Sequence, residues 1–114
     1  MNSIKLKPLS VNAAWQGRRF KTPEYTMFRK EFALLNGTCK TKAVGPITLD
    51  ITFTLTKKSF GLTDVDNLLK PTIDAIVECG CIADDRNIIE LTARKRLGED
   101  YEITFEIHDT KETA

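Results

Sequence analysis

The chain has 114 residues, of which 41% are hydrophobic and 29% are charged, and its formal net charge is +1. This composition excludes a disordered polar chain, and the length suits one compact domain rather than two independent ones. The charge also excludes the strong global positive charge that by itself indicates a nucleic-acid binder, so the distribution of charge along the chain becomes informative instead.

Charged residues are segregated along the chain. Acidic residues concentrate between Asp64 and Asp85. Basic residues gather in four groups, which are Arg18, Arg19 and Lys21, then Arg29 and Lys30, then Lys57 and Lys58, and finally Arg94, Lys95 and Arg96. This separation leaves room for a local phosphate-binding face.

No sequence feature predicts a membrane or secreted protein. The N-terminus lacks the apolar core of a signal peptide, and no apolar run approaches the ~20 residues of a membrane helix. The three cysteines, Cys39, Cys79 and Cys81, form no CxxC pair and leave one over in any pairing scheme, and Cys-Gly-Cys is too short for ordinary zinc spacing. We therefore expect free, partly buried thiols in a soluble protein of the reducing cytoplasm.

The first half of the chain predicts a strand, a helix and a second strand. A short strand is expected around Ile4 and Leu6, followed by a loop. Thr22-Pro23 is a capping residue followed by proline and predicts a helix start, and Asn36-Gly37 predicts its end. Strict apolar and polar alternation from Ile47 to Leu55 predicts a half-buried strand. The core face of the helix is predicted to hold Tyr25, Phe28, Phe32 and Leu35.

The second half predicts one helix followed by two strands. The helix is expected from about Asn67 to Cys79, beginning near Asp66, because Pro71 costs little near a helix start, and Gly80 follows its end. Its apolar face is predicted to hold Leu69, Ile73, Ile76 and Val77. Strands are expected at about 87–96 and 101–108, and their short connection through 98–100 predicts a hairpin.

The order of these elements indicates an α+β domain, in which two helices pack on a mixed or antiparallel sheet of about four strands. We expect this domain to span residues 1–108. Residues 109–114 are polar and predict a short C-terminal tail.

Acidic residues flank the second predicted helix at both ends. Asp64 and Asp66 precede it, and Asp84 and Asp85 follow it. Mg²⁺ and Mn²⁺ prefer carboxylate oxygens, and two such ions about 4 Å apart can activate water and stabilise the leaving oxygen in phosphodiester cleavage. Lys70, one turn after Asp66, could hold the scissile phosphate. These residues form one site only if the chain doubles back after the helix.

Each acidic pair also has a structural interpretation. Asp64 or Asp66 could simply cap the helix, because an N-terminal aspartate accepts hydrogen bonds from unpaired backbone N–H groups. The segment from Asp84 to Asn87 could be a polar turn that enters a strand. The spacing does not fit the twelve-residue Ca²⁺ loop between helices. On the residues alone, the metal site is a hypothesis beside these alternatives.

A longer pattern gives the acidic residues more weight. It reads Asp64-x-Asp66-Asn67-Leu68-x-Lys70-x-x-x-Asp74-Ala75, then Gly80 and Asp84-Asp85, with Ser10-Val11-Asn12, Trp15, Gly17-Arg18-Arg19 and Thr22-x-x-Tyr25 further upstream. This pattern resembles the signature of RusA-type crossover-junction endodeoxyribonucleases and covers most of the chain. The chain departs from the family before the first aspartate, where the run from Lys57 to Thr63 is less basic. That difference leaves junction affinity and cleavage preference open.

The resemblance implies a homodimeric, Mg²⁺- or Mn²⁺-dependent enzyme of DNA recombination and repair, often encoded by phages or prophages, that resolves Holliday junctions by paired nicks in opposed strands. It implies that Asp64, Asp66 and Asp85 bind the metal and that Lys70 is essential for catalysis. Asp74 and Asp84 become supporting candidates. A two-fold dimer would present one active site to each cut strand.

The basic residues are candidate contacts to branched DNA. Arg18, Arg19, Lys21, Lys57 and Lys58 could bind its phosphate backbone, although a solvated surface is the alternative for each. For the group at 94–96, protection of a sheet edge is an equally good interpretation.

Two other classes of protein compete with the nuclease. One is a non-catalytic protein that binds branched DNA with the same fold, and the other is a metal-stabilised structural domain. A pure binder gains nothing from four carboxylates beside phosphate, because they repel the ligand unless a metal ion intervenes. We therefore expect an enzyme.

Overall fold

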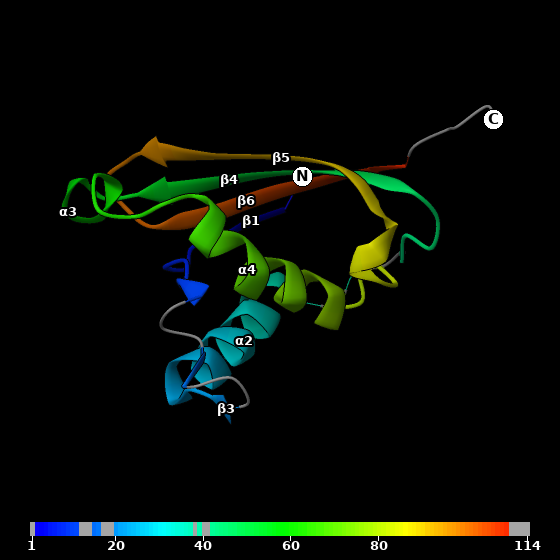
Figure 1. The fold of residues 1–114 in the computed structure, drawn as a ribbon, viewed down its shortest axis with the longest axis horizontal. Coiled ribbons are helices and arrows are strands. Elements are labelled where there is room, and N and C mark those ends of the chain that lie inside the picture. The colour runs from blue at the N-terminus through cyan, green and yellow to red at the C-terminus, as the bar shows by residue number, and fades with distance from the viewer. Residues whose placement is uncertain (1, 12–14, 17–19, 38, 40–41, 110–114) are drawn as a thin grey trace.

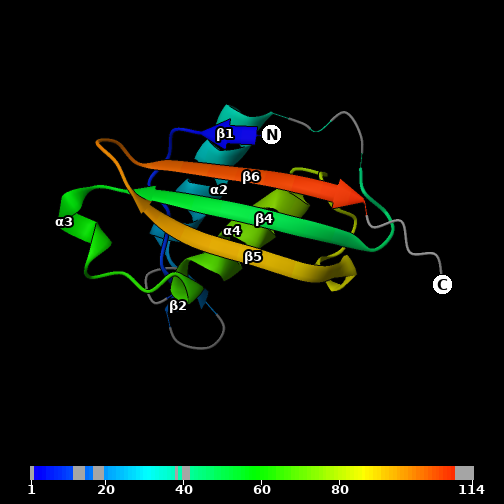
Figure 2. The same ribbon diagram turned by 90° about the horizontal axis from the view of Figure 1, so that it is seen from above.

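The computed structural model describes residues 2–11, 15–16, 20–37, 39 and 42–109, and for 15–16 and 20–21 the backbone alone. In this part of the chain, a four-stranded mixed sheet has helices on one face, which confirms the predicted α+β class (Figure 1). Seen from above, α2 lies under the β1–β6 side of the sheet, and α4 lies under β4 and β5 (Figure 2).

The sheet has the order β1-β6-β4-β5. Its strands are β1 (Asn2–Ile4), β4 (Ile47–Leu55), β5 (Ile88–Leu97) and β6 (Glu102–Asp109). The helices are α2 (Pro23–Asn36), α3 (Lys57–Phe60), α4 (Asp66–Glu78) and the 3₁₀ turn η1 (Asp85–Asn87). Strands β2 (Trp15–Gln16) and β3 (Phe20–Lys21) form a separate antiparallel pair in the region that was predicted to be a loop.

The core is organised around β4, which has the bounds that the sequence predicts. Its alternate side chains, Ile47, Leu49, Ile51 and Phe53, are fully buried. They point to the face that the helices cover, because successive side chains of a strand alternate between the two faces of the sheet. On this side Phe32 of α2 stacks on Phe105 of β6, with ring centroids 6.1 Å apart.

The predicted hairpin between the last two strands is wrong, because β4 lies between them. It pairs in parallel with β5 and antiparallel with β6. The short connection instead crosses the end of β4, where the Gly98 N–H donates to the Leu55 carbonyl oxygen over 2.9 Å. Two strand spacings of about 4.8 Å are within reach of four residues of chain, so a short connection does not require its strands to pair.

The crossing is tight at Gly98, and this predicts a cost for any side chain there. A Cβ atom on Gly98 would overlap the methyl group of Thr54, a buried residue of β4. We expect Gly98→Ala to lower the free energy of unfolding by about 1–3 kcal/mol, as overpacking does. Urea unfolding measures this loss. Gly45→Ala is the control, because nothing lies within 4 Å of a Cβ at Gly45, and an equal loss in both variants would contradict the crowding.

Helix α2 begins and ends as the sequence predicts. The Thr22 hydroxyl accepts a hydrogen bond from the Tyr25 N–H over 3.2 Å, and Gly37 follows the helix with φ of 72°. Tyr25, Phe28 and Phe32 are buried, but the prediction that Leu35 joins the core is wrong, because it is 54% exposed. Leu35 lies about 60° around the helix from Phe32 and so at the margin of the stripe.

Helix α4 also has the predicted bounds, and Gly80 follows it with φ of 81°. Its core face is shifted from the prediction, since the buried residues are Leu68, Pro71, Thr72, Ala75 and Ile76. Of the predicted face, Ile76 alone is buried, and Leu69, Ile73 and Val77 are half-buried. Thr72 lies at the centre of the buried stripe, and because it is polar, the apolar pattern of the sequence does not predict this face as the buried one.

The prediction of three free thiols is wrong, because Cys39 and Cys81 form a disulfide. Cys79 remains a half-buried free thiol. Burial raises the pKa of the Cys79 thiol. The argument for a reducing compartment from unpaired cysteines therefore falls away. Within the described ranges, no helix is both long and apolar enough to cross a membrane.

Candidate active site

Helix α4 carries a line of charged side chains along one face. Asp66, Lys70, Asp74 and Glu78 follow each other at intervals of four residues, which places neighbours about one turn apart. Lys70 and Asp74 form an ion pair on this line, with Nζ 3.0 Å from Oδ1. The stripe that the sequence predicts from Asp66 to Asp74 therefore exists on the helix surface.

Asp74 uses both of its carboxylate oxygens. Oδ1 accepts from Lys70, and Oδ2 accepts from the Tyr25 hydroxyl of α2 over 2.9 Å. Burial raises the pKa of Tyr25, and the hydrogen bond to Asp74 raises it further. A neutral, buried phenol on one helix is thus bonded to a carboxylate on the other.

Asp85, which follows α4 in the sequence, also lies beside Lys70. Its Oδ2 lies 3.7 Å from Lys70 Nζ. The hydrogen bond to Asp74 is the main cause that raises the pKa of Lys70, and the charge of Asp85 adds to it. The chain therefore doubles back after Gly80, as the hypothesis of one site requires.

Residues 81–85, the returning segment, double back after α4 and are held by hydrogen bonds to Ala43, which lies before β4. The Ala43 N–H donates to the Cys81 carbonyl oxygen over 3.0 Å, and the Ala83 N–H donates to the Ala43 carbonyl oxygen over 2.8 Å. Ile82 between them is fully buried. Together with the disulfide at Cys81, these contacts fix the chain that leads into Asp84 and Asp85.

Asp84 and Asp85 differ in their surroundings although they are neighbours. Asp84 caps η1, accepting from the Arg86 N–H over 2.9 Å and from Arg86 Nε over 3.1 Å. These bonds lower the pKa of Asp84 to about 2. The segment from Asp84 to Asn87 is thus a polar turn that enters β5, as the structural interpretation predicts, and Asp85 within this turn also faces Lys70.

Asp64 and Asp66 precede the helix or begin it, and both are exposed. The N-cap of α4 is Val65, and no side chain of the described residues accepts a cap hydrogen bond there. The capping interpretation of these two aspartates is therefore wrong. Their carboxylates lie at the end of α4 where the helix dipole favours negative charge.

Lys95 of β5 supports the loop that leads to Asp64. Its Nζ donates to the carbonyl oxygens of Phe60 and Thr63, over 2.7 and 3.0 Å, and lies 4.6 Å from the centre of the Phe60 ring. Sequence reasoning grouped Lys95 with its basic neighbours and missed this role. The alternation of strand residues is the signal that could have found it, because it turns Lys95 to the opposite face from Arg94 and Arg96.

The structure does not gather the three predicted metal ligands. Among the residues that it describes, no three Asp, Glu, His or Cys side chains are placed to share a metal ion. Asp85 lies beside Lys70 and Asp74, while Asp64 and Asp66 stand at the start of α4. Like-charged carboxylates repel one another without a cation between them. As exposed oxygen donors, the three aspartates nevertheless suit Mg²⁺ or Mn²⁺ chemically.

The predicted DNA contacts are placed only in part. Arg18 and Arg19 lie outside the described residues, and Lys21 belongs to β3. Lys57 and Lys58 are exposed on α3. Arg94 instead binds within the sheet, with its Nη1 2.7 Å from Asp50 Oδ1, and this bond lowers the pKa of Asp50.

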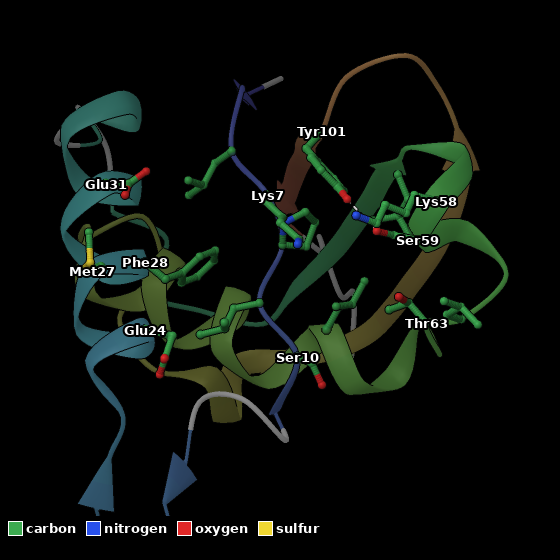
Figure 3. A pocket seen from close by; sticks show the side chains of 16 residues that line it. Lys7, Ser10, Glu24, Met27, Phe28, Glu31, Lys58, Ser59, Thr63 and Tyr101 are labelled. Atoms are coloured by element: carbon green, nitrogen blue, oxygen red, sulfur yellow. Dashed lines mark hydrogen bonds between the residues drawn. The ribbon is translucent and has the colours of Figure 1, made fainter.

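A groove of about 690 Å³ lies beside the acidic segment, residues 64–85. Figure 3 shows Glu24, Met27 and Phe28 of α2 on one side and Lys58 with Tyr101 on the other. The wall of the groove includes Thr63, the residue before Asp64. The groove therefore adjoins one end of the candidate site.

Comparison with known proteins gives one positive finding. The family model described as Endodeoxyribonuclease RusA matches residues 8–108. This range includes every acidic candidate and Lys70. A search of the curated proteins found no match.

Proposed function

Because the chain belongs to the RusA endodeoxyribonuclease family, we propose that it is a Mg²⁺- or Mn²⁺-dependent nuclease that resolves Holliday junctions by paired nicks, acting as a homodimer. The observation that supports this most is the ion pair between Lys70 and Asp85. It joins a cation on α4 to an acid on the returning segment that follows the helix, and Asp74 lies on the other side of the same cation. The proposal includes action on cytoplasmic DNA, in recombination and repair or in the life cycle of a phage.

The proposed roles follow from the chemistry of the side chains. Asp64, Asp66 and Asp85 would hold the metal, which when bound lowers the pKa of water and stabilises the leaving oxygen. Lys70 would bind an oxygen of the scissile phosphate and offset the charge that develops on it. The chain would need to bring Asp64 and Asp66 nearer to Asp85, and a cation removes the repulsion that opposes this.

Contacts to the rest of the DNA would come from basic side chains. Lys57 and Lys58 stand on α3, exposed and in the element just before the acidic segment. Arg18, Arg19 and Lys21 remain candidates from the sequence. Such contacts position DNA without reading its bases. Two copies related by a two-fold axis would then set one site against each of two opposed strands.

The first experiment is cleavage of a synthetic mobile four-way junction, with each strand labelled in turn, in Mg²⁺, in Mn²⁺ and in chelator. We expect symmetric nicks in opposed strands that require the metal, and none in a linear duplex of the same sequence. Binding of the junction without metal-dependent cutting would instead support a non-catalytic protein of branched DNA. Equal cutting of the linear duplex would contradict selectivity for junctions.

A further inference from the structure

We propose that Tyr25 and Asp74 are positioning residues that hold the Lys70 ammonium beside Asp85 for the reaction. This inference rests on the proposed nuclease function and adds a role for a side chain on α2, outside the acidic segment. It concerns a continuous series of polar contacts. The contacts run from the Tyr25 hydroxyl to the Asp74 carboxylate, from there to the Lys70 ammonium, and then to Asp85.

Lys70 needs an external support because its own helix holds it weakly. Its side chain is 56% exposed, and a lysine has a flexible stem that samples many rotamers in solvent. The pair with Asp74 has the lysine before the acid, which is the weaker orientation for residues four apart on a helix. An isolated α4 would therefore leave the ammonium only loosely placed.

Tyr25 supplies this support from the core. Tyr25 is 1% exposed, and it lies in the first turn of α2, which Thr22 caps. A packed ring of this kind has little rotational freedom, so the position of its hydroxyl is fixed. The bond of 2.9 Å to Oδ2 orients the Asp74 carboxylate, whose other oxygen then holds Lys70.

Asp74 also prevents Lys70 from pairing completely with Asp85. The Lys70 ammonium is 3.0 Å from Asp74 but 3.7 Å from Asp85. The longer distance exceeds that of a direct hydrogen bond, about 2.7–3.2 Å. The cation is thus close to Asp85 without occupying its oxygens. If Asp74 were lost, Asp85 would be the nearest remaining acid, and Lys70 would neutralise a proposed metal ligand.

The same helix interface offers a matched control. Arg29 and Glu78 follow Tyr25 and Asp74 by four residues each, and Arg29 Nε donates to Glu78 Oε2 over 2.6 Å. This pair also joins α2 to α4. In the part of the chain that the structure describes, neither Arg29 nor Glu78 forms a hydrogen bond or an ion pair with Lys70. Glu78→Gln therefore removes one polar contact of this interface and keeps the hydrogen bond between Tyr25 and Asp74. The contact of Arg29 with the Tyr25 ring, 5.7 Å from Cζ to the ring centre, does not involve Glu78.

The test is single-turnover junction cleavage by the full chain and its variants at saturating metal and enzyme. We expect Tyr25→Phe and Asp74→Asn each to lower the rate constant roughly 10- to 100-fold, as displacement of a catalytic group by up to about 1 Å does. The dissociation constant for the junction, measured with Ca²⁺ in place of the active metal, should stay unchanged. The double variant should be no slower than the slower single variant, because the two residues act as one unit. Glu78→Gln should cut at nearly the wild-type rate.

A second readout follows Lys70 without any catalysis. In ¹⁵N-edited NMR spectra of lysine ammonium groups, the Lys70 signal is assigned by its loss in Lys70→Arg. We expect this signal to be protected from exchange in the wild type and in Glu78→Gln, and to be lost in Tyr25→Phe and Asp74→Asn. Thermal unfolding of each variant checks that the fold persists.

The outcomes separate this inference from the function on which it rests. If the wild type cuts junctions and Tyr25→Phe cuts equally fast, the positioning role is overturned and the nuclease function stands. An equal loss of rate in Glu78→Gln also overturns it, because the effect would then belong to the helix interface in general. If the wild type does not cut with any metal, both the proposed function and the positioning role fail.

Discussion

Asp66→Asn is expected to lower the rate of junction cleavage by at least about 10³-fold, or about 4 kcal/mol of transition-state stabilisation, because it removes the charge of a proposed metal ligand. The change is nearly isosteric. Asp66 is exposed in the first turn of α4, whose N-cap is Val65. Losing a negative charge near a helix N-terminus costs only about 0.3–1 kcal/mol of stability. The fold should therefore persist, and the loss of rate should report on chemistry alone.

The measurement combines cleavage with binding. The junction should still shift in a native gel with Asp66→Asn, since removal of a carboxylate does not weaken contacts to phosphate. Glu106→Gln is the control, because it removes one negative charge from the open face of the sheet, which is opposite the helices. Equal loss of cleavage in the two variants would assign the effect to net charge and would contradict a ligand role for Asp66.

The second large effect is expected on stability, from the disulfide between Cys39 and Cys81. Their separation is 42 residues. Closing a loop of that length restricts the unfolded chain by about 4 kcal/mol at 25 °C in the chain-entropy treatment. We expect Cys39→Ser to lower the free energy of unfolding by up to this amount. Reductant should have the same effect on the wild type and none on the variant.

Urea unfolding with and without reductant measures this difference. Cys79→Ser is the control, since Cys79 is the free thiol and its loss leaves the disulfide intact. Titration of thiols in the denatured, unreduced protein should find one per chain. Three thiols, with no effect of reductant on the wild type, would restore the sequence-based prediction of free cysteines.

The elements that the sequence predicts well are those with local signals. Strand β4 is predicted by the alternation of apolar and polar residues along its own length. Helix α2 is predicted by the residues at its two ends, Thr22 and Gly37. The start of α4 follows from where Pro71 can be tolerated. Each of these signals acts over a few residues of chain, so no knowledge of distant contacts is needed to use it.

The misjudged features depend on contacts between distant segments. The connection after β5 has the length of a hairpin loop, but β4 takes the place between the two strands. The pairing of Cys39 with Cys81 depends on how the ends of α2 and α4 lie together. An odd number of cysteines does not disclose this arrangement.

The candidate site divides in the same way. The ion pair of Lys70 and Asp74 could be predicted, because residues four apart meet on a helix surface. The approach of Asp85 required the chain to reverse after Gly80, which the sequence permits without specifying. The bond from Tyr25 to Asp74 could not be predicted, since it depends on the relative placement of two helices.

The order of strands in the sheet has a consequence for the timing of folding. The inner strand β4 is synthesised long before β5 and β6, the strands that flank it. Strand β1 likewise pairs only with β6, and Ser3 lies opposite Thr104. Contacts between residues so distant in sequence slow folding, because a long stretch of chain must be ordered before they form. During synthesis, the apolar β4 therefore has no partner in this sheet until the last third of the chain has emerged. The nascent protein passes through a stage in which that strand is open to aggregation or to a chaperone.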